Sequence, residues 1–229
     1  MGENILKREK TCHIICHGDV SFYDLNIDLQ DGDICVAVDA GFYYCEPFGV
    51  DPDLIIGDMD SVKEKGEWSD IEEIMEENPE MVEILSTEKD DTDTLAAIKA
   101  GFARGYRRFC LFGALGKRLD HTIANIQCLS YILNQGGKGY IMDGKMEITA
   151  IKNDTIRYAA DSQGTLSLFA LGERAEGVSI KGMKYLLEDA VVTNDFPIGI
   201  SNEFIGEEAE ITVRNGMLLL INDMCGDWW

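Results

Sequence analysis

Apolar residues in about the first 140 positions occur as short runs, separated by longer stretches in which they recur every three or four residues. The short runs have the length of buried strands, and the longer stretches have the spacing of amphipathic helices. The runs lie at 12–16, 34–38, 54–56, 81–85, 109–112 and 140–142, and the helical stretches at 68–77, 94–104 and 122–133. Alternating strands and helices are typical of crossover connections. We therefore predict an α/β fold in this part, with an open, mostly parallel sheet and flanking helices.

The pattern changes at about Gly144, after which short apolar runs follow one another at close intervals with turn residues between them. No long helical pattern interrupts them, and Arg214-Asn215-Gly216 between two apolar runs is a strong hairpin signal. These features are typical of an antiparallel β-sandwich. We therefore predict two domains, an α/β domain at 1–143 and a β-sandwich domain at 144–229.

The chain of 229 residues carries 42 acidic and 20 basic residues, a formal net charge of −22. This charge would repel nucleic acids and anionic lipids, and it would attract divalent cations and a cationic small molecule. Solubility alone explains most of the acidic residues. The N-terminal segment is charged and lacks the apolar core of a signal peptide, and the longest uncharged stretch, 122–137, is too short to span a bilayer. We expect a cytoplasmic protein with neither a nucleic acid nor a membrane as partner.

Seven cysteines occur at irregular spacing, and two of them stand beside two histidines in the segment Cys12-His13-Ile14-Ile15-Cys16-His17. Cys and His are zinc ligands, but this segment is apolar and strand-like, and no second cysteine pair completes a tetrahedral site. We therefore do not expect a zinc site here and leave the role of Cys12 and Cys16 open. Cys35, Cys110 and Cys128 lie inside apolar runs, where a free thiol packs as a small hydrophobic side chain.

Acidic residues and glycines follow the ends of four predicted strands. They form the segments Asp39-Ala40-Gly41, Gly57-Asp58-Met59-Asp60-Ser61, Lys89-Asp90-Asp91-Thr92-Asp93 and Gly113-Ala114-Leu115-Gly116-Lys117-Arg118. For any single loop this composition is ordinary. Ligands of open α/β sheets, however, bind beyond the carboxyl ends of the strands. Four such loops together predict one binding site along that edge.

The aspartates of these loops suit a magnesium ion, which is usually held by a few carboxylates and by substrate phosphates. Asp58 and Asp60, two apart in a segment expected to be extended, would point the same way and could share a metal. Asp90 and Asp93 come just before a helix expected from Thr94. Asp93 either caps this helix or faces the site, and Thr94 is the competing cap.

The loop 113–118 contains two glycines that allow the backbone to approach phosphate, followed by Lys117 and Arg118 in a chain with few cations. Arginine binds phosphate oxygens through two parallel hydrogen bonds. The loop is not a P-loop, because it lacks Gly-Lys-Ser/Thr. After Asp120 comes His121, with Asn125 on the same helical face, so His121 is a general base, a hydrogen-bond donor or a structural helix-terminal residue. Together these loops indicate a magnesium-dependent phosphoryl-transfer site.

In their order and composition these segments resemble the thiamin pyrophosphokinase family, and the resemblance covers nearly the whole chain. The most specific elements are Gly57-Asp58-Met59-Asp60-Ser61 and Lys89-Asp90-Asp91-Thr92-Asp93. Asp39-Ala40-Gly41 and the segment 113–121 with Asn125 also match. In the second predicted domain, the segments 181–187 and 199–203 resemble the thiamin-binding half of the family.

The resemblance implies that the chain transfers a diphosphate from ATP to the hydroxyl of thiamin, with AMP leaving, and that it forms a homodimer with thiamin sites between the subunits.

The resemblance also implies roles for individual residues. Asp58, Asp60 and Asp93 would hold Mg²⁺, and Lys89 and Arg118 would hold phosphate oxygens. Asp39, Asp90, Asp120 and His121 would order the site, where one carboxylate accepts the hydroxyl proton. The ATP site would be completed by Thr92, Gly113, Gly116, Lys117 and Asn125. Ser201 and Asn202 would hydrogen-bond the aminopyrimidine of thiamin, next to Lys184 and Tyr185.

The sequence departs from the family pattern in three places. Ala40 and Lys117 stand where the family usually has glycine. The last strand, Leu218-Leu219-Leu220-Ile221, lacks the tryptophan that the family tends to place near thiamin, and Trp228 and Trp229 lie beyond it. Which aromatic residue stacks on thiamin is therefore left open.

Two alternative functions remain. A phosphoesterase of the Asp-His-His type would hold its metals with more histidines than the three present. A thiamin or nucleotide sensor without turnover would not need so many mutually repelling carboxylates.

Overall fold

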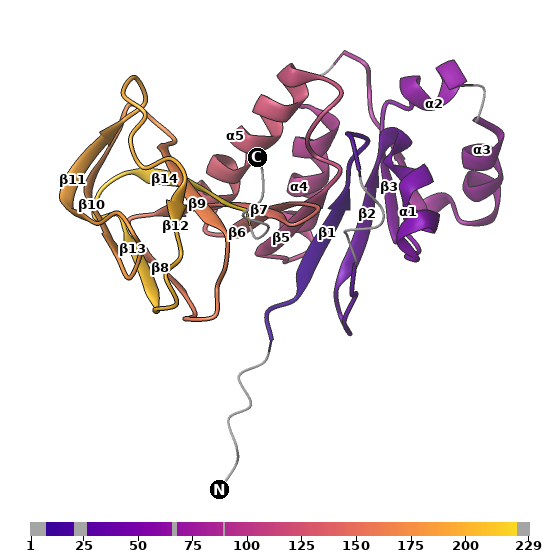
Figure 1. Ribbon diagram of the computed structural model, residues 1–229. Coiled ribbons are helices and arrows are strands. Elements are labelled where there is room, and N and C mark those ends of the chain that lie inside the picture. Colours follow the sequence, from indigo (N-terminus) through magenta and orange to yellow (C-terminus); the bar gives the residue numbers. More distant parts are fainter. Residues whose placement is uncertain (1–7, 21–26, 66–67, 89, 224–229) are drawn as a thin grey trace, which may run out of the picture. The chain divides into compact units, whose positions relative to one another are not determined.

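The computed structural model describes residues 8–20, 27–65, 68–88 and 90–223 (Figure 1). These residues form two compact units. The first unit comprises the chain up to Gly18 and from position 27 up to Gly113, and the second comprises Asp19, Val20 and the chain from Ala114 onward. Lys89, Trp228 and Trp229 lie outside the described residues.

A five-stranded parallel sheet forms the centre of the first unit, in the spatial order β5-β1-β2-β3-β4. Its strands are β1 (Thr11–Ile15), β2 (Ile34–Val38), β3 (Leu54–Gly57), β4 (Val82–Ile84) and β5 (Arg108–Phe112). β1 and β3 are buried along their whole length. This is the burial of parallel strands covered on both faces, and it explains why their sequences are continuous apolar runs. The predicted mostly parallel N-terminal sheet is confirmed.

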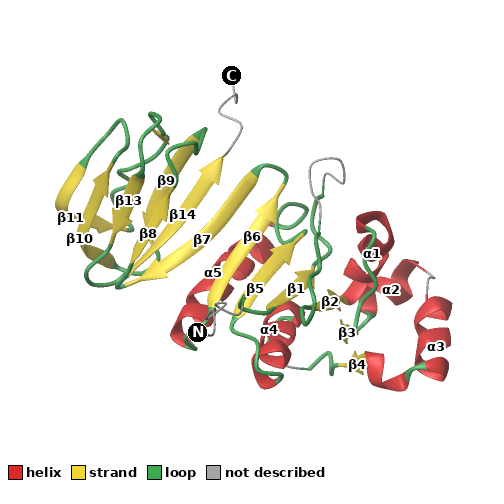
Figure 2. Ribbon diagram, turned by 90° about the horizontal axis from the view of Figure 1, so that it is seen from below, coloured by secondary structure: helices red, strands yellow, loops and turns green. Residues whose placement is uncertain are grey.

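Helices flank this sheet (Figures 1 and 2). They are the 3₁₀ helix η1 (Asp39–Gly41), α1 (Phe42–Phe48), α2 (Asp60–Lys65), α3 (Trp68–Glu77), the 3₁₀ helix η2 (Pro79–Met81) and α4 (Asp93–Ala103). α4 packs closely on β1 and β5 at Gly101, where an added Cβ would lie 2.6 Å from the Phe109 ring and 3.0 Å from the Cys12 sulfur. Only glycine permits this approach.

The first helix or strand of the second unit is α5 (Leu119–Asn134), and antiparallel strands follow it. The strands are β6 (Lys138–Asp143), β7 (Met146–Lys152), β8 (Thr155–Tyr158), β9 (Thr165–Ala170), β10 (Arg174–Lys181), β11 (Leu187–Thr193), β12 (Asn202–Glu203), β13 (Ala209–Thr212) and β14 (Met217–Asp223). They form one layer in the order β12-β9-β14-β7-β6 and a second in the order β11-β10-β13-β8. No helix within the described ranges is both long and apolar enough to cross a membrane.

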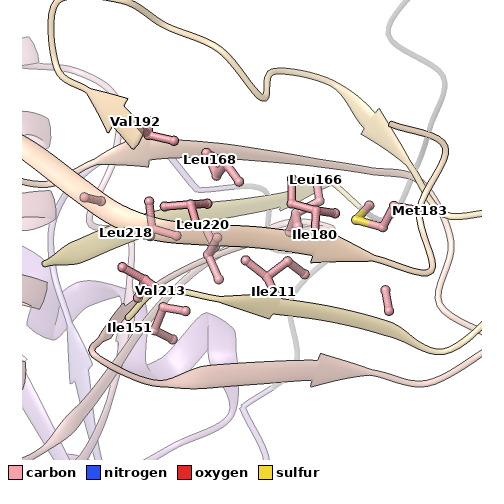
Figure 3. Close-up of a cluster of buried hydrophobic side chains, with 13 residues drawn as sticks. Ile151, Leu166, Leu168, Ile180, Met183, Val192, Ile211, Val213, Leu218 and Leu220 are labelled. Atoms are coloured by element: carbon pink, nitrogen blue, oxygen red, sulfur yellow. The ribbon is translucent and has the colours of Figure 1, made fainter. Parts of the chain in front are cut away.

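The two layers of the second unit enclose an apolar core (Figure 3). Ile151, Leu166 and Leu218 reach it from one layer, and Ile180 and Ile211 reach it from the other. Alternate residues of each strand face this core, as Leu218 and Leu220 do in β14. The predicted C-terminal antiparallel β-sandwich is confirmed.

The border between the compact units differs from the predicted domain boundary at 143/144. α5 packs on β6 and β7, and these two strands form an antiparallel hairpin. These contacts join α5 and β6 to the C-terminal strands, so the border falls between Gly113 and Ala114. The functional division into 1–143 and 144–229 stays a prediction.

Candidate active site

The carboxyl ends of β2 and β3 bring Asp39 and the segment Gly57–Asp58 side by side. Asp39 directly follows β2 with a φ of 50°, in the left-handed region that few residues other than glycine adopt. A Cβ added at Gly57 would lie 3.1 Å from both the Cα and the Cβ of Asp39. Glycine at 57 is therefore what allows the two loops to meet at this edge.

The segment after β3 is a turn, so the expectation of an extended Asp58-Met59-Asp60 is wrong. Met59 has a φ of 60° and a fully buried side chain, which fixes the turn from inside. Asp58 Oδ1 accepts a hydrogen bond from the backbone N of Asp60 at 3.2 Å, and Asp60 begins α2. Asp60 is exposed and Asp58 partly exposed. This turn, rather than strand alternation, sets the positions of Asp58 and Asp60.

The start of α4 lies at the same edge. Thr92 is the N-cap of α4, since its Oγ1 accepts from the backbone N of Leu95 at 3.2 Å, so neither Asp93 nor Thr94 is the cap. Thr94 is buried, with its Oγ1 3.6 Å from the Cys16 sulfur just beyond β1. Asp93 is thereby held in the first turn of α4, where the helix dipole favours negative charge.

The donor chemistry of this edge fits magnesium. Asp39, Asp58, Asp60 and Asp93 offer oxygen ligands only. Among the residues that the structure describes, no three His, Cys, Asp or Glu side chains lie close enough to hold a metal ion by themselves. Magnesium in phosphoryl-transfer sites commonly takes further oxygens from substrate phosphates. Asp90 lies exposed in the loop before α4.

The loop before α5 contains the predicted cations. Arg118 donates to both carboxylate oxygens of Asp120, from Nε at 3.2 Å and from Nη2 at 2.6 Å. This pair lowers the pKa of Asp120 to about 2. Asp120 Oδ1 also accepts from the backbone N of His121 at 3.0 Å, and His121 and Lys117 are both exposed. Asp120 thus orients the guanidinium at the start of α5.

Asn125 has a role that its helical spacing from His121 did not indicate. Its buried side-chain Nδ2 donates to the backbone O of Ala114 at 2.7 Å, which ties the loop to α5. Gly116 has a φ of 77°, and Gly113, at the end of β5 in the first unit, has a φ of 59°.

Asp19 is a residue of this loop region that the sequence analysis missed. Its Oδ2 accepts from the backbone N of Lys117 at 2.9 Å. The signal that could have found it is the one used for Asp39 and Asp58, an acid just after a strand, because Gly18-Asp19 follows β1.

The predicted thiamin residues lie together in the second unit, where the segments around Lys184 and Glu203 run side by side. Asn202 is buried: its Oδ1 accepts from the backbone N of Tyr185 at 2.9 Å and of Glu203 at 3.0 Å, and its Nδ2 donates to the Tyr185 backbone O at 2.7 Å. Asn202 therefore clamps the backbone of Tyr185. Its predicted contact with thiamin stays a prediction.

The neighbours of this clamp are exposed. Lys184 Nζ forms an ion pair with Glu203 and lies 5.5 Å from the centre of the Tyr185 ring, and the Glu203 hydrogen bond raises the Lys184 pKa. Ser201 has a φ of 53°, and its backbone N donates to Ser167 Oγ at 3.0 Å. The Tyr185 side chain is 58% exposed.

Comparisons with known proteins match two parts of this chain to domains of one family. Residues 28–141 match the family described as "Thiamin pyrophosphokinase, catalytic domain", and residues 153–218 match "Thiamin pyrophosphokinase, vitamin B1 binding domain". Thiamine pyrophosphokinase of Bacillus subtilis is 24% identical over 93% of this chain and 98% of its own. Its crystal structure superposes with a TM-score of 0.79 at 22% identity, covering 94% of this chain and 99% of that one. The structure of thiamin pyrophosphokinase from Geobacillus thermodenitrificans gives a TM-score of 0.76 at 25% identity, covering 93% and 97%.

Proposed function

The chain belongs to the thiamin pyrophosphokinase family, and from this premise we propose how its own residues transfer a diphosphate from ATP to the hydroxyl of thiamin. The main support for this function is that the chain matches both the catalytic domain and the vitamin B1 binding domain of the family, in that order. The first part contains the strand-end carboxylates, and the second contains the Tyr185–Asn202 clamp.

The carboxylates at the ends of β2 and β3 and at the start of α4 would bind the metal and the reacting groups. Asp58, Asp60 and Asp93 would hold Mg²⁺, which when bound neutralises charge on the triphosphate. Asp39, held against Gly57, would order this edge, and Asp90 would have the same role. One of the carboxylates would accept the proton of the thiamin hydroxyl.

The loop before α5 would hold the phosphates. Arg118 uses Nε and Nη2 for Asp120, so its Nη1 group would bind a phosphate oxygen. Lys117 and Lys89 would add positive charge, and His121 would complete the ATP site with Thr92, Gly113, Gly116 and Asn125.

Thiamin would bind at the clamp formed by Asn202. Tyr185 is an exposed aromatic residue beside it, and we place its ring against thiamin in the role of the absent strand tryptophan. Ser201 and Lys184 would lie at the polar edge of this site.

The family resemblance further suggests a homodimer with thiamin sites between its subunits. Exposed apolar side chains lie on and next to the clamp segments: Tyr185 at 58%, Leu186 at 66%, Ile200 at 44% and Ile205 at 50% exposure. A second copy of the chain would cover such side chains.

A product assay tests the function. Incubated with thiamin, ATP and magnesium chloride, the protein should release AMP and thiamin diphosphate in equal amounts. ADP as the nucleotide product would exclude diphosphate transfer. If both ligands bind but no nucleotide product forms, the chain is a sensor.

The same assay with Asp60→Asn tests the metal proposal. Loss of this carboxylate should lower turnover by roughly a hundredfold or more, because the charge stabilisation it supplies to the transfer is removed. Asp70→Asn is the matched control, since Asp70 is likewise an exposed acid in the first turn of a helix, α3. Equal rates for Asp60→Asn and the control would contradict the assignment.

A further inference from the structure

The backbone of the loop before α5 is left-handed at two consecutive residues. Gly116 has a φ of 77° and Lys117 a φ of 50°, and only the first is a glycine. A left-handed conformation is unfavourable at a residue with a side chain, as at Lys117. The surrounding structure must therefore hold the loop in this shape.

Asp19 holds the loop on both sides of Gly116. Its carboxylate Oδ2 accepts from the backbone N of Lys117 at 2.9 Å, and its own backbone N donates to the O of Leu115 at 2.8 Å. These two bonds connect residues almost a hundred positions apart in the sequence.

The fit between Asp19 and Gly116 leaves no room for a side chain. A Cβ added at Gly116 would lie 2.3 Å from Oδ2 of Asp19 and 2.6 Å from its Cβ and Cγ. Glycine at 116 is therefore required twice, for its φ and for the approach of Asp19.

The far side of the loop is anchored separately. Asn125 Nδ2 binds the backbone O of Ala114, and Asp120 holds the Arg118 guanidinium. Asp19 thus contacts the backbone of Lys117 itself, next to the arginine proposed to bind phosphate.

We propose that Asp19 is a positioning residue for ATP: by fixing the backbone at Gly116 and Lys117, it sets the direction in which Lys117 and Arg118 meet the phosphates. This inference rests on the proposed function. Asp19 acts through the loop and not by touching the substrate.

The test compares Asp19→Ala with Asp19→Asn. The alanine variant loses the acceptor for the Lys117 N–H, and we expect the KM for Mg·ATP to rise roughly tenfold, with a smaller fall in kcat and an unchanged KM for thiamin. The asparagine variant keeps a side-chain oxygen and should stay within about twofold of the wild-type KM. Asp161→Ala, which removes an exposed aspartate elsewhere in the second unit, is the matched control.

Gly116→Ala is a second substitution that disrupts the contact between Asp19 and this loop. It should reproduce the Asp19→Ala phenotype, because the added Cβ displaces Asp19. The double variant Asp19→Ala/Gly116→Ala should have the same KM for Mg·ATP as Gly116→Ala alone, because both substitutions disrupt the same contact between Asp19 and the loop.

Two results would overturn the proposal. A wild-type KM for Mg·ATP in Asp19→Ala would show that the loop does not need Asp19. Equal loss in Asp19→Asn and Asp19→Ala would show that the charge, and not the hydrogen bond, matters.

Binding of a non-hydrolysable ATP analogue, measured by calorimetry, separates failure of this proposal from failure of the proposed function. If the wild type makes no thiamin diphosphate, the function fails, whereas weaker analogue binding by Asp19→Ala than by Asp19→Asn still supports the positioning role. Equal binding by the two variants would refute it.

Discussion

At the scale of single residues, the structure explains the histidine of β1. Asp33 has no exposed side-chain surface and accepts hydrogen bonds from Arg8, from the backbone N of Thr11 and from His13 Nε2 at 3.2 Å. Burial alone would raise the Asp33 pKa, but these hydrogen bonds hold it well below its usual range. Burial lowers the pKa of His13 despite the Asp33 contact. The Cys12 and Cys16 side chains are both buried.

The lowered pKa of His13 predicts loss of stability in acid. The unfolded chain takes up a proton on this histidine near pH 6.5, whereas the folded chain does so only at lower pH. Below pH 6.5 the unfolded state therefore binds more protons, and the free energy of unfolding falls as pH falls, by at most about 1.4 kcal/mol per pH unit for one group. Chemical denaturation between pH 7 and pH 5 should show a shallower slope for His13→Gln. Parallel slopes for the wild type and His13→Gln would contradict this prediction.

At the scale of elements, the short segments between strands carry the site geometry. The expected helices 94–104 and 122–133 agree closely with α4 (Asp93–Ala103) and α5 (Leu119–Asn134). Their amphipathic spacing is a local signal. The turn at Met59 and the clamp on Tyr185 depend on contacts made elsewhere in the fold, and they fix the backbone beside the proposed site residues.

The clamp predicts a selective defect in thiamin binding. Asn202→Ala removes three hydrogen bonds and leaves the backbone groups of Tyr185 without this partner, so the Tyr185 ring would lose its fixed position. We expect the KM for thiamin to rise roughly tenfold and the KM for ATP to change less than twofold. Steady-state kinetics with each substrate varied in turn would measure both values. Asn194→Ala, at an exposed position of the second unit, is the control. An equal rise in both KM values would assign Asn202 a general structural role.

At the scale of the whole molecule, the net charge of −22 and the exposed apolar side chains have opposite effects on association. Leu186 and Ile205 are exposed apolar side chains in the two segments that contain the proposed thiamin residues. A contact between copies that buries these side chains would place the thiamin sites at the interface.

The dimer proposal predicts linked losses of assembly and turnover. The double change Leu186→Glu and Ile205→Glu puts charge into the proposed interface, where its desolvation opposes association. Sedimentation velocity should show dimers for the wild type and monomers for the variant, with loss of thiamin turnover and unchanged binding of the ATP analogue. Ile84→Glu, at an exposed apolar position of the first unit, should remain dimeric. A variant that stays dimeric would place the interface elsewhere.

The sequence by itself determined the alternation of strands and helices, the change to antiparallel strands and the placement of acids at strand ends. These properties follow from local hydrophobic periodicity and from the common direction of parallel strands, which brings their carboxyl ends to one edge. For that reason Asp39, Asp58 and Asp93 could be placed at a candidate site from the sequence.

Only the tertiary structure decided how these loops are held. The roles of Asp19 against Gly116, of Asn125 on Ala114 and of Asn202 on Tyr185 depend on residues that meet across long sequence separations. The turn at Met59 depends on a backbone angle stabilised by a buried side chain. Neither a long-range contact nor a left-handed φ at a residue other than glycine leaves a periodic signal in the sequence, because both arise from packing between elements.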